Sequence, residues 1–202
     1  MAVITISRQF GAGGKTLGRL IAESLNYTFA DSSIVQRLAK EANVSTDWVI
    51  AHEKEAGSTF SRLLNTMVSR SLIDRVIKDE RGYLDEQIYL DYLVLIIAQI
   101  ADEGDVVILG RGSQYILKDH PEAYHVLLIN NLDNRVQFMV ENYDLTEKKA
   151  RQLVNFEDRR RTNLYRKLGK TDYDSPSLYH LVLNMERFSM DEALQQVFFL
   201  IS

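Results

Sequence analysis

The chain has 202 residues, 46% of them hydrophobic and 26% charged, with a formal net charge of −4 at pH 7. These values are typical of a single globular domain with a sizeable core, and the acidity excludes a general attraction for nucleic acid or an anionic membrane surface. The absence of cysteine excludes disulfides, thiolate catalysis and cysteine zinc sites. Because the sequence enters a strand almost at once and has no apolar run long enough to span a bilayer, we expect a cytoplasmic protein.

The first predicted elements are a strand at 3–7, a glycine-rich loop at 8–16 and an amphipathic helix at 17–25. Glycines lack a Cβ, so the loop can curl until successive N–H groups point into one concavity beside the positive end of the helix. Such a concavity binds phosphate groups. Lys15 would reach the outer phosphates, and the Thr16 hydroxyl with waters would coordinate Mg²⁺. The residues predicted to bind the phosphate chain are Gly11, Ala12, Gly13, Gly14, Lys15 and Thr16.

The P-loop pattern G-x-x-x-x-G-K-[ST] fits this loop in two registers. If the pattern ends at Lys15 and Thr16, its first glycine position holds Gln9. If it is counted from the end of the strand, Gly14 takes the lysine position and Lys15 comes one place late. A glycine-rich turn without a ligand is the alternative, but the flanking strand and helix and the Lys-Thr ending favour phosphate binding.

A polar tip follows the second predicted strand, at 27–30. Asp31 and Ser32 could simply cap the next helix, although the carboxyl ends of parallel strands are also where α/β sheets bind ligands. Arg37 follows about one and a half helical turns later and could lie near the same tip. We therefore keep Asp31, Ser32 and Arg37 as site candidates.

The stretch 45–101 shows apolar residues at helical spacing and no convincing strand, which predicts a mostly helical insertion. Its apolar segment 93–97 is compatible with a homodimer formed through a helix. The third strand, 105–109, ends in Gly110-Arg111-Gly112. Arg111 could pair with a surface acid, but an arginine at a rigid strand end is well placed to bind a phosphate through two hydrogen bonds.

The fourth strand is predicted at 124–129 and the fifth at 179–184, and a capping box that begins at Ser189 opens the last helix. Strands that alternate with helices predict a parallel sheet. Between these two strands, 146–168 is the most basic part of the chain and contains three consecutive arginines. Successive helical residues are about 100° apart, so at most two of these arginines can point at one ligand. A solvated face balanced by acids is the alternative.

These features together resemble the nucleoside monophosphate kinases, and in detail the cytidylate kinase-like family of P-loop proteins. The segment 31–37 is similar to the Asp-Ser-Gly-x-x-Tyr-Arg segment of cytidylate kinases, and 110–112 to their Gly-Arg-Asp. Arg159 to Arg161 fall where those enzymes carry lid arginines. The resemblance implies an α/β P-loop NTPase fold: three α/β/α layers, a five-stranded parallel sheet, a helical monophosphate-binding insertion and a helical lid. In a single domain, the core would comprise 1–44, 102–145 and 177–202, the insertion about 45–101 and the lid about 146–176.

The resemblance also implies a cytoplasmic kinase that uses ATP and Mg²⁺ to phosphorylate a nucleoside monophosphate, most favourably CMP or dCMP. Its catalytic residues would be Lys15, Arg159 and Arg161, and the acceptor would be bound by Asp31, Ser32, Arg37 and Arg111. Its partners would be small nucleotides, with no nucleic acid and no membrane. Two alternatives stay open. The irregular loop and Gly112, in place of the family's aspartate, favour a regulatory nucleotide-binding protein without turnover, and the acceptor could be another small molecule.

Overall fold

The structure is a computed structural model that describes residues 2–31 and 86–202. The chain divides into two compact units, one formed by Met1–Ser32 and Glu103–Ser202 and the other by Ser33–Asp102. Helix α6 (Glu86–Glu103) supplies the described part of the second unit. It lies at the end of the stretch predicted to be a helical insertion; the rest of that stretch is outside the described residues. The following paragraphs concern the first unit.

The first unit is built on a five-stranded sheet in the order β2-β3-β1-β4-β5, and every strand pair is parallel. The five strands are β1 (Val3–Arg8), β2 (Thr28–Ala30), β3 (Val106–Leu109), β4 (Ala123–Ile129) and β5 (Leu181–Asn184). The prediction of five parallel strands is confirmed. The carboxyl ends of β1 and β3 are neighbours, because Ile6 pairs with Leu109 in the register of the sheet. The loops that follow these two strands therefore lie at one edge.

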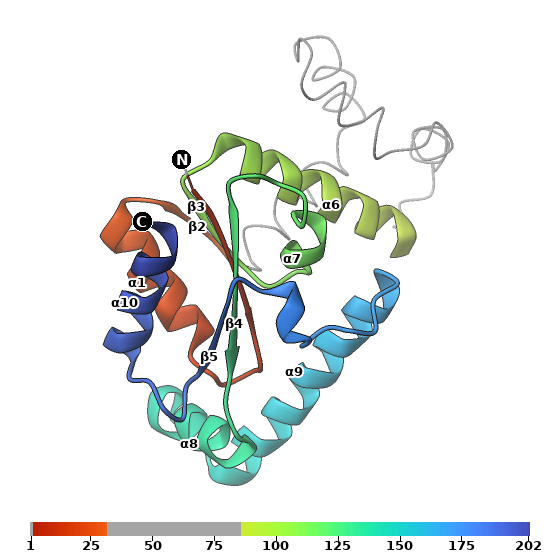
Figure 1. The fold of residues 1–202 in the computed structure, drawn as a ribbon. Coiled ribbons are helices and arrows are strands. Elements are labelled where there is room, and N and C mark those ends of the chain that lie inside the picture. Colours follow the sequence, from red (N-terminus) through yellow and green to blue (C-terminus); the bar gives the residue numbers. More distant parts are fainter. Residues whose placement is uncertain (1, 32–85) are drawn as a thin grey trace, which may run out of the picture. The chain divides into compact units, whose positions relative to one another are not determined.

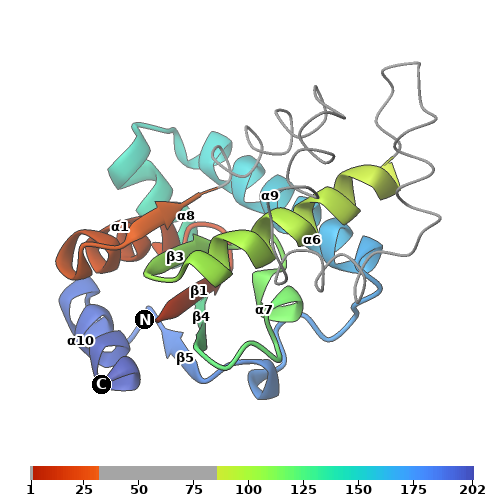
Figure 2. The same ribbon diagram turned by 90° about the horizontal axis from the view of Figure 1, so that it is seen from above.

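Helices cover both faces of this sheet (Figures 1 and 2). Helices α1 (Gly14–Leu25) and α10 (Met190–Ile201) lie side by side on one face, whereas α7 (Ser113–Ile116) and α9 (Glu147–Lys167) lie on the other side of the strands. The main core is formed by apolar side chains of the strands and of α1 and α10, including Ile4, Ile6, Leu17, Ile21, Val126, Leu128, Leu183 and Val197. Their burial fixes the positions of the strand ends.

A smaller core joins α8 (Leu132–Tyr143) to α9. Val136 and Met139 of α8 pack with Ala150 and Val154 of α9, and all four are buried. Helices α8 and α10, which follow β4 and β5, each begin with a side-chain cap. Asn131 accepts a hydrogen bond from the Asn134 N–H at 2.8 Å, and the predicted capping box at Ser189 is confirmed.

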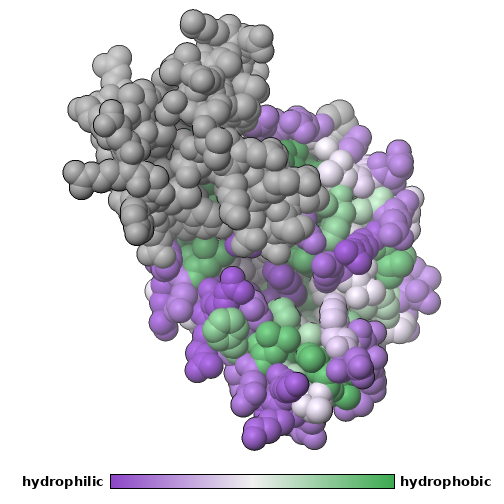
Figure 3. Space-filling model, turned by 180° about the vertical axis from the view of Figure 1, so that it is seen from behind, coloured by the Kyte–Doolittle hydropathy of each residue, from purple (hydrophilic) through white to green (hydrophobic). Residues whose placement is uncertain are grey.

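The last connection, from α9 to β5, contains a short 3₁₀ turn, η1 (Pro176–Leu178). Among residues 2–31 and 86–202, no helix is long and apolar enough to cross a membrane. On the face shown in Figure 3, the hydrophobic residues of the described part lie in small groups between hydrophilic ones.

A buried histidine lies in the middle of the sheet. His125 on β4 is 4% exposed, and its Nδ1 is 2.8 Å from the Thr5 Oγ1 on β1. Its ring stacks on His180 with centroids 5.1 Å apart. Burial, and secondarily the neighbouring His180, lower the pKa of His125 to about 4 from 6.5. The folded state therefore holds this imidazole neutral, as the sequence position within a buried strand suggests.

This lowered pKa predicts a loss of stability in mild acid. Above pH 6.5 the imidazole is neutral in both states, but between pH 6.5 and 4 the unfolded chain binds a proton that the folded chain does not. We expect this site to remove about 2 kcal/mol from the free energy of unfolding by pH 5. Urea unfolding at several pH values would measure the loss. His125→Asn should abolish this part of it and His120→Asn should not; equal pH dependence in wild type and His125→Asn would contradict the prediction.

Candidate active site

The glycine-rich loop between β1 and α1 presents a set of unpaired backbone donors. Gly13 caps α1 in the left-handed conformation, at φ 82°, and no side chain caps this helix end. In the part of the chain that the structure describes, no hydrogen bond uses the N–H groups of Gly13, Gly14, Lys15 or Thr16. The first turn of α1 also lacks acidic residues. Unpaired N–H groups at a positive helix end form an anion site, so this cradle fits a phosphate chain.

Two glycines of the loop are required by close packing as well as by conformation. Gly11 has φ 85°, and a Cβ on it would lie 2.7 Å from the Arg135 carbonyl oxygen. A Cβ on Gly13 would lie 2.8 Å from the Met190 Cε. A larger residue at position 11 would displace the loop, because its neighbour is backbone of α8, whereas at position 13 the Met190 side chain can move and the left-handed φ is the stronger constraint.

Gln9 joins the loop to the end of β4. Its N–H donates to the Leu128 carbonyl at 3.0 Å, and its side-chain Oε1 accepts from the Asn130 N–H, also at 3.0 Å. A glycine could not make the second bond. The residue that interrupts one register of the P-loop pattern therefore has a structural role of its own.

A carboxylate of α9 holds the same loop from the other side. Asp158 accepts a hydrogen bond from the Phe10 N–H at 3.1 Å and an ion-paired one from Arg135 Nη1 at 2.7 Å. Arg135 Nη1 also donates to the Phe10 carbonyl at 3.1 Å. Arg135 is buried and the Asp158 side chain is 30% exposed. The loop, α8 and α9 thus meet at one small hydrogen-bonded group.

Lys15 and Thr16 lie in the first turn of α1, and both are exposed. The Lys15 Nζ is 3.5 Å from the Asp31 Oδ2 at the end of β2. Two residues predicted for different parts of the site, the phosphate loop and the acceptor pocket, are therefore brought into contact. Ser32 and Arg37 were predicted for the acceptor pocket and lie outside the described residues.

Arg111 occupies a strained turn at the end of β3. It has φ 61° and stands between Gly110 at 72° and Gly112 at 73°, so three consecutive residues are left-handed. Such strain in a residue with a side chain is typical of functional sites. Gly112 is also constrained, because a Cβ there would lie 2.5 Å from the Leu168 Cδ1. Cytidylate kinases carry an aspartate at the position that corresponds to Gly112. In this chain the end of α9 packs close to that position.

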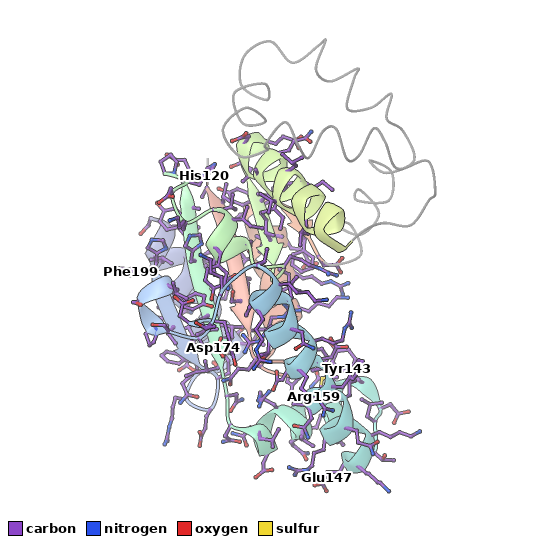
Figure 4. The ribbon with its side chains drawn as sticks, turned by 90° about the vertical axis from the view of Figure 1, so that its right-hand side faces the viewer. His120, Tyr143, Glu147, Arg159, Asp174 and Phe199 are labelled. Carbon is purple, nitrogen blue, oxygen red and sulfur yellow. The ribbon has the colours of Figure 1, made fainter. Side chains whose placement is uncertain are left out.

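The three arginines of α9 point to different surroundings. Arg159 is exposed, and Arg160 makes an exposed ion pair with Glu157 at 2.8 Å. Arg161 is half-buried and donates from both Nη atoms to the Asp174 carboxylate, at 2.8 and 2.7 Å. Figure 4 shows Arg159 and Asp174 well apart along this part of the molecule. Of the two predicted lid arginines, only Arg161 is thus directed at a carboxylate of the neighbouring loop.

Aromatic side chains surround the Arg161 guanidinium. Its Cζ lies 5.6 Å from the ring centre of Tyr165 and 5.9 Å from that of Tyr173. Burial by itself would lower the pKa of Arg161, but the hydrogen bonds with Asp174 and the charges of Tyr165, Asp174 and Asp158 together outweigh it, and the pKa is raised. Arg161 therefore stays charged. Sequence reasoning did not assign these tyrosines to the site, because helical spacing alone makes Tyr165 a core residue.

The sequence analysis also missed Arg8, the last residue of β1. Its half-buried side chain lies against two glycines: Gly14 at the start of α1 and Gly110 at the end of β3. Loss of solvent lowers the pKa of Arg8 most. Tyr165 raises the pKa, the nearby charges of Arg161 and Arg111 lower it, and Glu157 raises it, so that the pKa is lowered overall. A basic residue directly after a buried strand and before a glycine-rich loop is a pattern that could have identified Arg8 from the sequence.

The model of the cytidylate kinase-like family matches residues 3–187, which is most of the chain. The chain belongs to this family. Membership in a kinase-like family supports a phosphotransferase and implies the use of ATP and Mg²⁺ in general terms. The glycine cradle and the exposed Thr16 hydroxyl fit these groups, although no three His, Asp or Glu side chains gather as a metal site within the described ranges.

Solved structures with the same fold include an uncharacterized protein from Eubacterium ventriosum, with a TM-score of 0.71 and 18% identity over 99% of this chain and 97% of that one. A gluconokinase from Sinorhizobium meliloti 1021 is similar at a TM-score of 0.51 and 12% identity, over 99% of this chain and 91% of that one. These likenesses show the P-loop kinase fold and confirm the predicted fold class. A search of the curated proteins found no match.

The Asp158 contacts predict that this carboxylate stabilises the fold. In Asp158→Ala the Phe10 N–H loses its acceptor and buried Arg135 loses its counter-ion, so we expect the free energy of unfolding to fall by about 2 kcal/mol. Urea unfolding at pH 7.5 measures this change. The matched control is Asp119→Ala, whose carboxylate makes only an exposed ion pair with Lys118 and whose loss should cost less than about 1 kcal/mol. Equal losses in the two variants would contradict the prediction.

Proposed function

We propose that this kinase-like chain transfers a phosphoryl group from ATP to a nucleoside monophosphate, most favourably CMP or dCMP. The observation that carries the proposal is the meeting of an unpaired N–H cradle with several cationic side chains at one edge of the sheet. The cradle follows β1, and Arg111 follows the neighbouring strand β3. Phosphoryl transfer asks the protein for positioning and charge stabilisation, which such an arrangement supplies.

On the donor side, the backbone N–H groups of Gly11 and of Gly13 to Thr16 are proposed to bind the phosphates of ATP. The Ala12 N–H, which the sequence had also assigned to this cradle, instead donates to the Gln9 carbonyl at 3.1 Å. Mg²⁺-bound ATP would supply the transferable phosphoryl group, with Thr16 and waters as ligands of the metal. Lys15 adds a positive charge at the exposed end of the cradle. Its contact with Asp31, at 3.5 Å, is loose enough for a phosphate oxygen to compete with the carboxylate for the ammonium.

On the acceptor side, Arg111 is proposed to bind the phosphate of the monophosphate together with Ser32 and Arg37, while Asp31 contacts the acceptor. The strained backbone at Arg111 supports this role, because a left-handed conformation in a non-glycine residue is typical of functional sites. The number of arginines at this edge favours an anionic acceptor. A neutral acceptor would need polar donors and acceptors rather than additional positive charge.

The segment 146–176 is proposed to act as the lid. Arg161 and Arg159 would contact phosphates during transfer, and closure of the lid would exclude water from the reacting groups. The bidentate contact of Arg161 with Asp174 supports a defined resting position for the first of these arginines. Arg159, exposed on the same helix, would reach the phosphates only after a movement of the lid.

Two other functions are kept. The similarity in fold to a gluconokinase favours a small hydroxyl compound as acceptor, and the interrupted P-loop pattern favours a regulatory protein that binds nucleotide without turnover. A homodimer formed through α6 is also compatible with the sequence, but three apolar residues of that segment, Leu93, Ile96 and Ile97, are buried within the chain and do not support it.

The role of Lys15 predicts that activity depends on it far more than stability does. Lys15→Ala should lower kcat at least about 10-fold because a charge that stabilises the phosphates is lost. It should change the free energy of unfolding by less than about 1 kcal/mol, because the side chain is 46% exposed. Release of ADP in a coupled assay and urea unfolding measure the two effects. Lys118→Ala, which removes another exposed, ion-paired lysine, should change neither; wild-type turnover in Lys15→Ala would remove Lys15 from the site.

The identity of the acceptor can be tested by comparing candidate acceptors with the wild-type protein. With MgATP present, CMP or dCMP should support ADP release and raise the thermal midpoint more than UMP, AMP or gluconate does. Release of ADP with gluconate alone would favour the hydroxyl acceptor. A midpoint raised by ATP without ADP release from any of these acceptors would favour the regulatory function.

A further inference from the structure

Gly14 stands at the lysine position when the P-loop pattern is counted from the end of the strand. The structure has the geometry of this register at the helix start: Gly13 is the left-handed cap and Gly14 is the first residue of α1. Gly14 itself does not have a left-handed φ. Its backbone would therefore accept a side chain, and another feature of the structure must account for the glycine.

That feature is the side chain of Arg8. A Cβ on Gly14 would lie 2.9 Å from the Arg8 Cγ, 3.1 Å from its Cβ and 3.2 Å from its Cδ. These distances are shorter than ordinary van der Waals contacts. The aliphatic part of Arg8 thus fills the volume in which a lysine side chain at position 14 would begin, and the two side chains are mutually exclusive there.

The guanidinium of Arg8 continues from Gly14 to the tip of β3. A Cβ on Gly110 would clash with the Arg8 Nη1, so a second glycine, at φ 72°, leaves room for this group. Two loops that are far apart in the sequence therefore both lack a side chain where Arg8 passes. The path places a positive charge between the phosphate cradle and the left-handed turn at Arg111.

The surroundings of Arg8 suit an anion. Among the described residues no carboxylate forms an ion pair or a hydrogen bond with it, and the nearby Arg161 is already paired with Asp174. Burial decides that the pKa of Arg8 is lowered: the charges of Arg161 and Arg111 lower it as well, whereas Tyr165 and the Glu157 carboxylate raise it. A half-buried guanidinium that no carboxylate contacts costs free energy, and a bound phosphate would remove that cost.

We propose that Arg8 supplies the positive charge that the loop lysine supplies in an ordinary P-loop, and that it binds the terminal phosphate of the donor nucleotide. The inference rests on the proposed phosphotransferase function. It gives a role at the donor phosphate to a residue that the P-loop pattern does not include. Lys15, beside Asp31, then lies at the outer side of the same phosphates. Arg8 is an additional catalytic residue because it would contact the group that is transferred.

The test compares nucleotide binding by charge-preserving and charge-removing variants. Calorimetric titration with Mg²⁺ and a non-hydrolysable ATP analogue, and separately with MgADP, reports the contact with the terminal phosphate without turnover. We expect Arg8→Gln to weaken binding of the ATP analogue about 10- to 100-fold and binding of ADP much less. Arg8→Lys should stay closer to wild type. Arg160→Gln, which removes an exposed arginine of α9, is the matched control and should bind both nucleotides as wild type does.

An exchange of side chains provides a second, independent measurement. In the double variant Arg8→Gly with Gly14→Lys, the new lysine would occupy the space that Arg8 leaves, and we expect it to recover most of the affinity for the ATP analogue that Arg8→Gly alone loses. Thermal unfolding establishes that each variant is folded. If Arg8→Gln does not fold, Arg8→Lys serves in its place. It retains the charge but shortens the donor group, and its affinities for the ATP analogue and for ADP can still be compared.

Failure of this inference and failure of the proposed function give different results. If wild type binds the ATP analogue and folded Arg8→Gln binds it equally well, Arg8 has no role at the terminal phosphate and the inference is wrong, whereas the proposed function stands. An exchange variant that is folded but gains no affinity over Arg8→Gly also counts against it. If wild type binds neither nucleotide, the proposed function fails and the role of Arg8 fails with it.

Discussion

The carboxylate of Asp158 is the contact on which the shape of the candidate site depends. One oxygen accepts the Phe10 N–H and the other pairs with Arg135, which returns a hydrogen bond to the Phe10 carbonyl. This small group ties the glycine-rich loop to both α8 and α9. A loop of glycines has many conformations available in the unfolded chain, so its cradle exists only because such contacts select one. Donors that are already in place need no reorganisation when an anion binds.

Strand apolarity and local motifs made much of the first unit predictable from the sequence. Continuous apolar runs predicted the buried parallel strands, and the Ser189 pattern predicted a capping box that the structure confirms. These features depend on residues that are near one another in the chain. The glycine-rich loop was predicted for the same reason, because a strand, glycines and a helix follow in immediate succession.

The partners of the charged residues could not be predicted in this way. Helical spacing separates the directions of Arg159, Arg160 and Arg161, but it does not indicate that the third meets Asp174 on a later loop. Likewise the sequence assigned Lys15 and Asp31 to different ligands, whereas parallel pairing brings the ends of their elements together. The position of the Arg8 side chain depends on glycines at 14 and 110, which leave room for it. A glycine on a distant loop produces no periodic pattern in the sequence, so this contact could not be predicted.

The chain concentrates positive charge in one place although its net charge is −4. Each guanidinium at the sheet edge is accommodated differently: Arg161 by Asp174 and two aromatic rings, Arg111 by a strained turn, and Arg8 by glycines on either side. The Asp174 carboxylate neutralises Arg161 through two hydrogen bonds. Burial lowers the pKa of Arg8 most, and Arg161 and Arg111 lie close enough for their charges to lower it further; this repulsion opposes folding and is relieved when an anion binds the folded state. These charges therefore couple the stability of the folded chain to phosphate binding, and relief of their repulsion contributes to the free energy of binding.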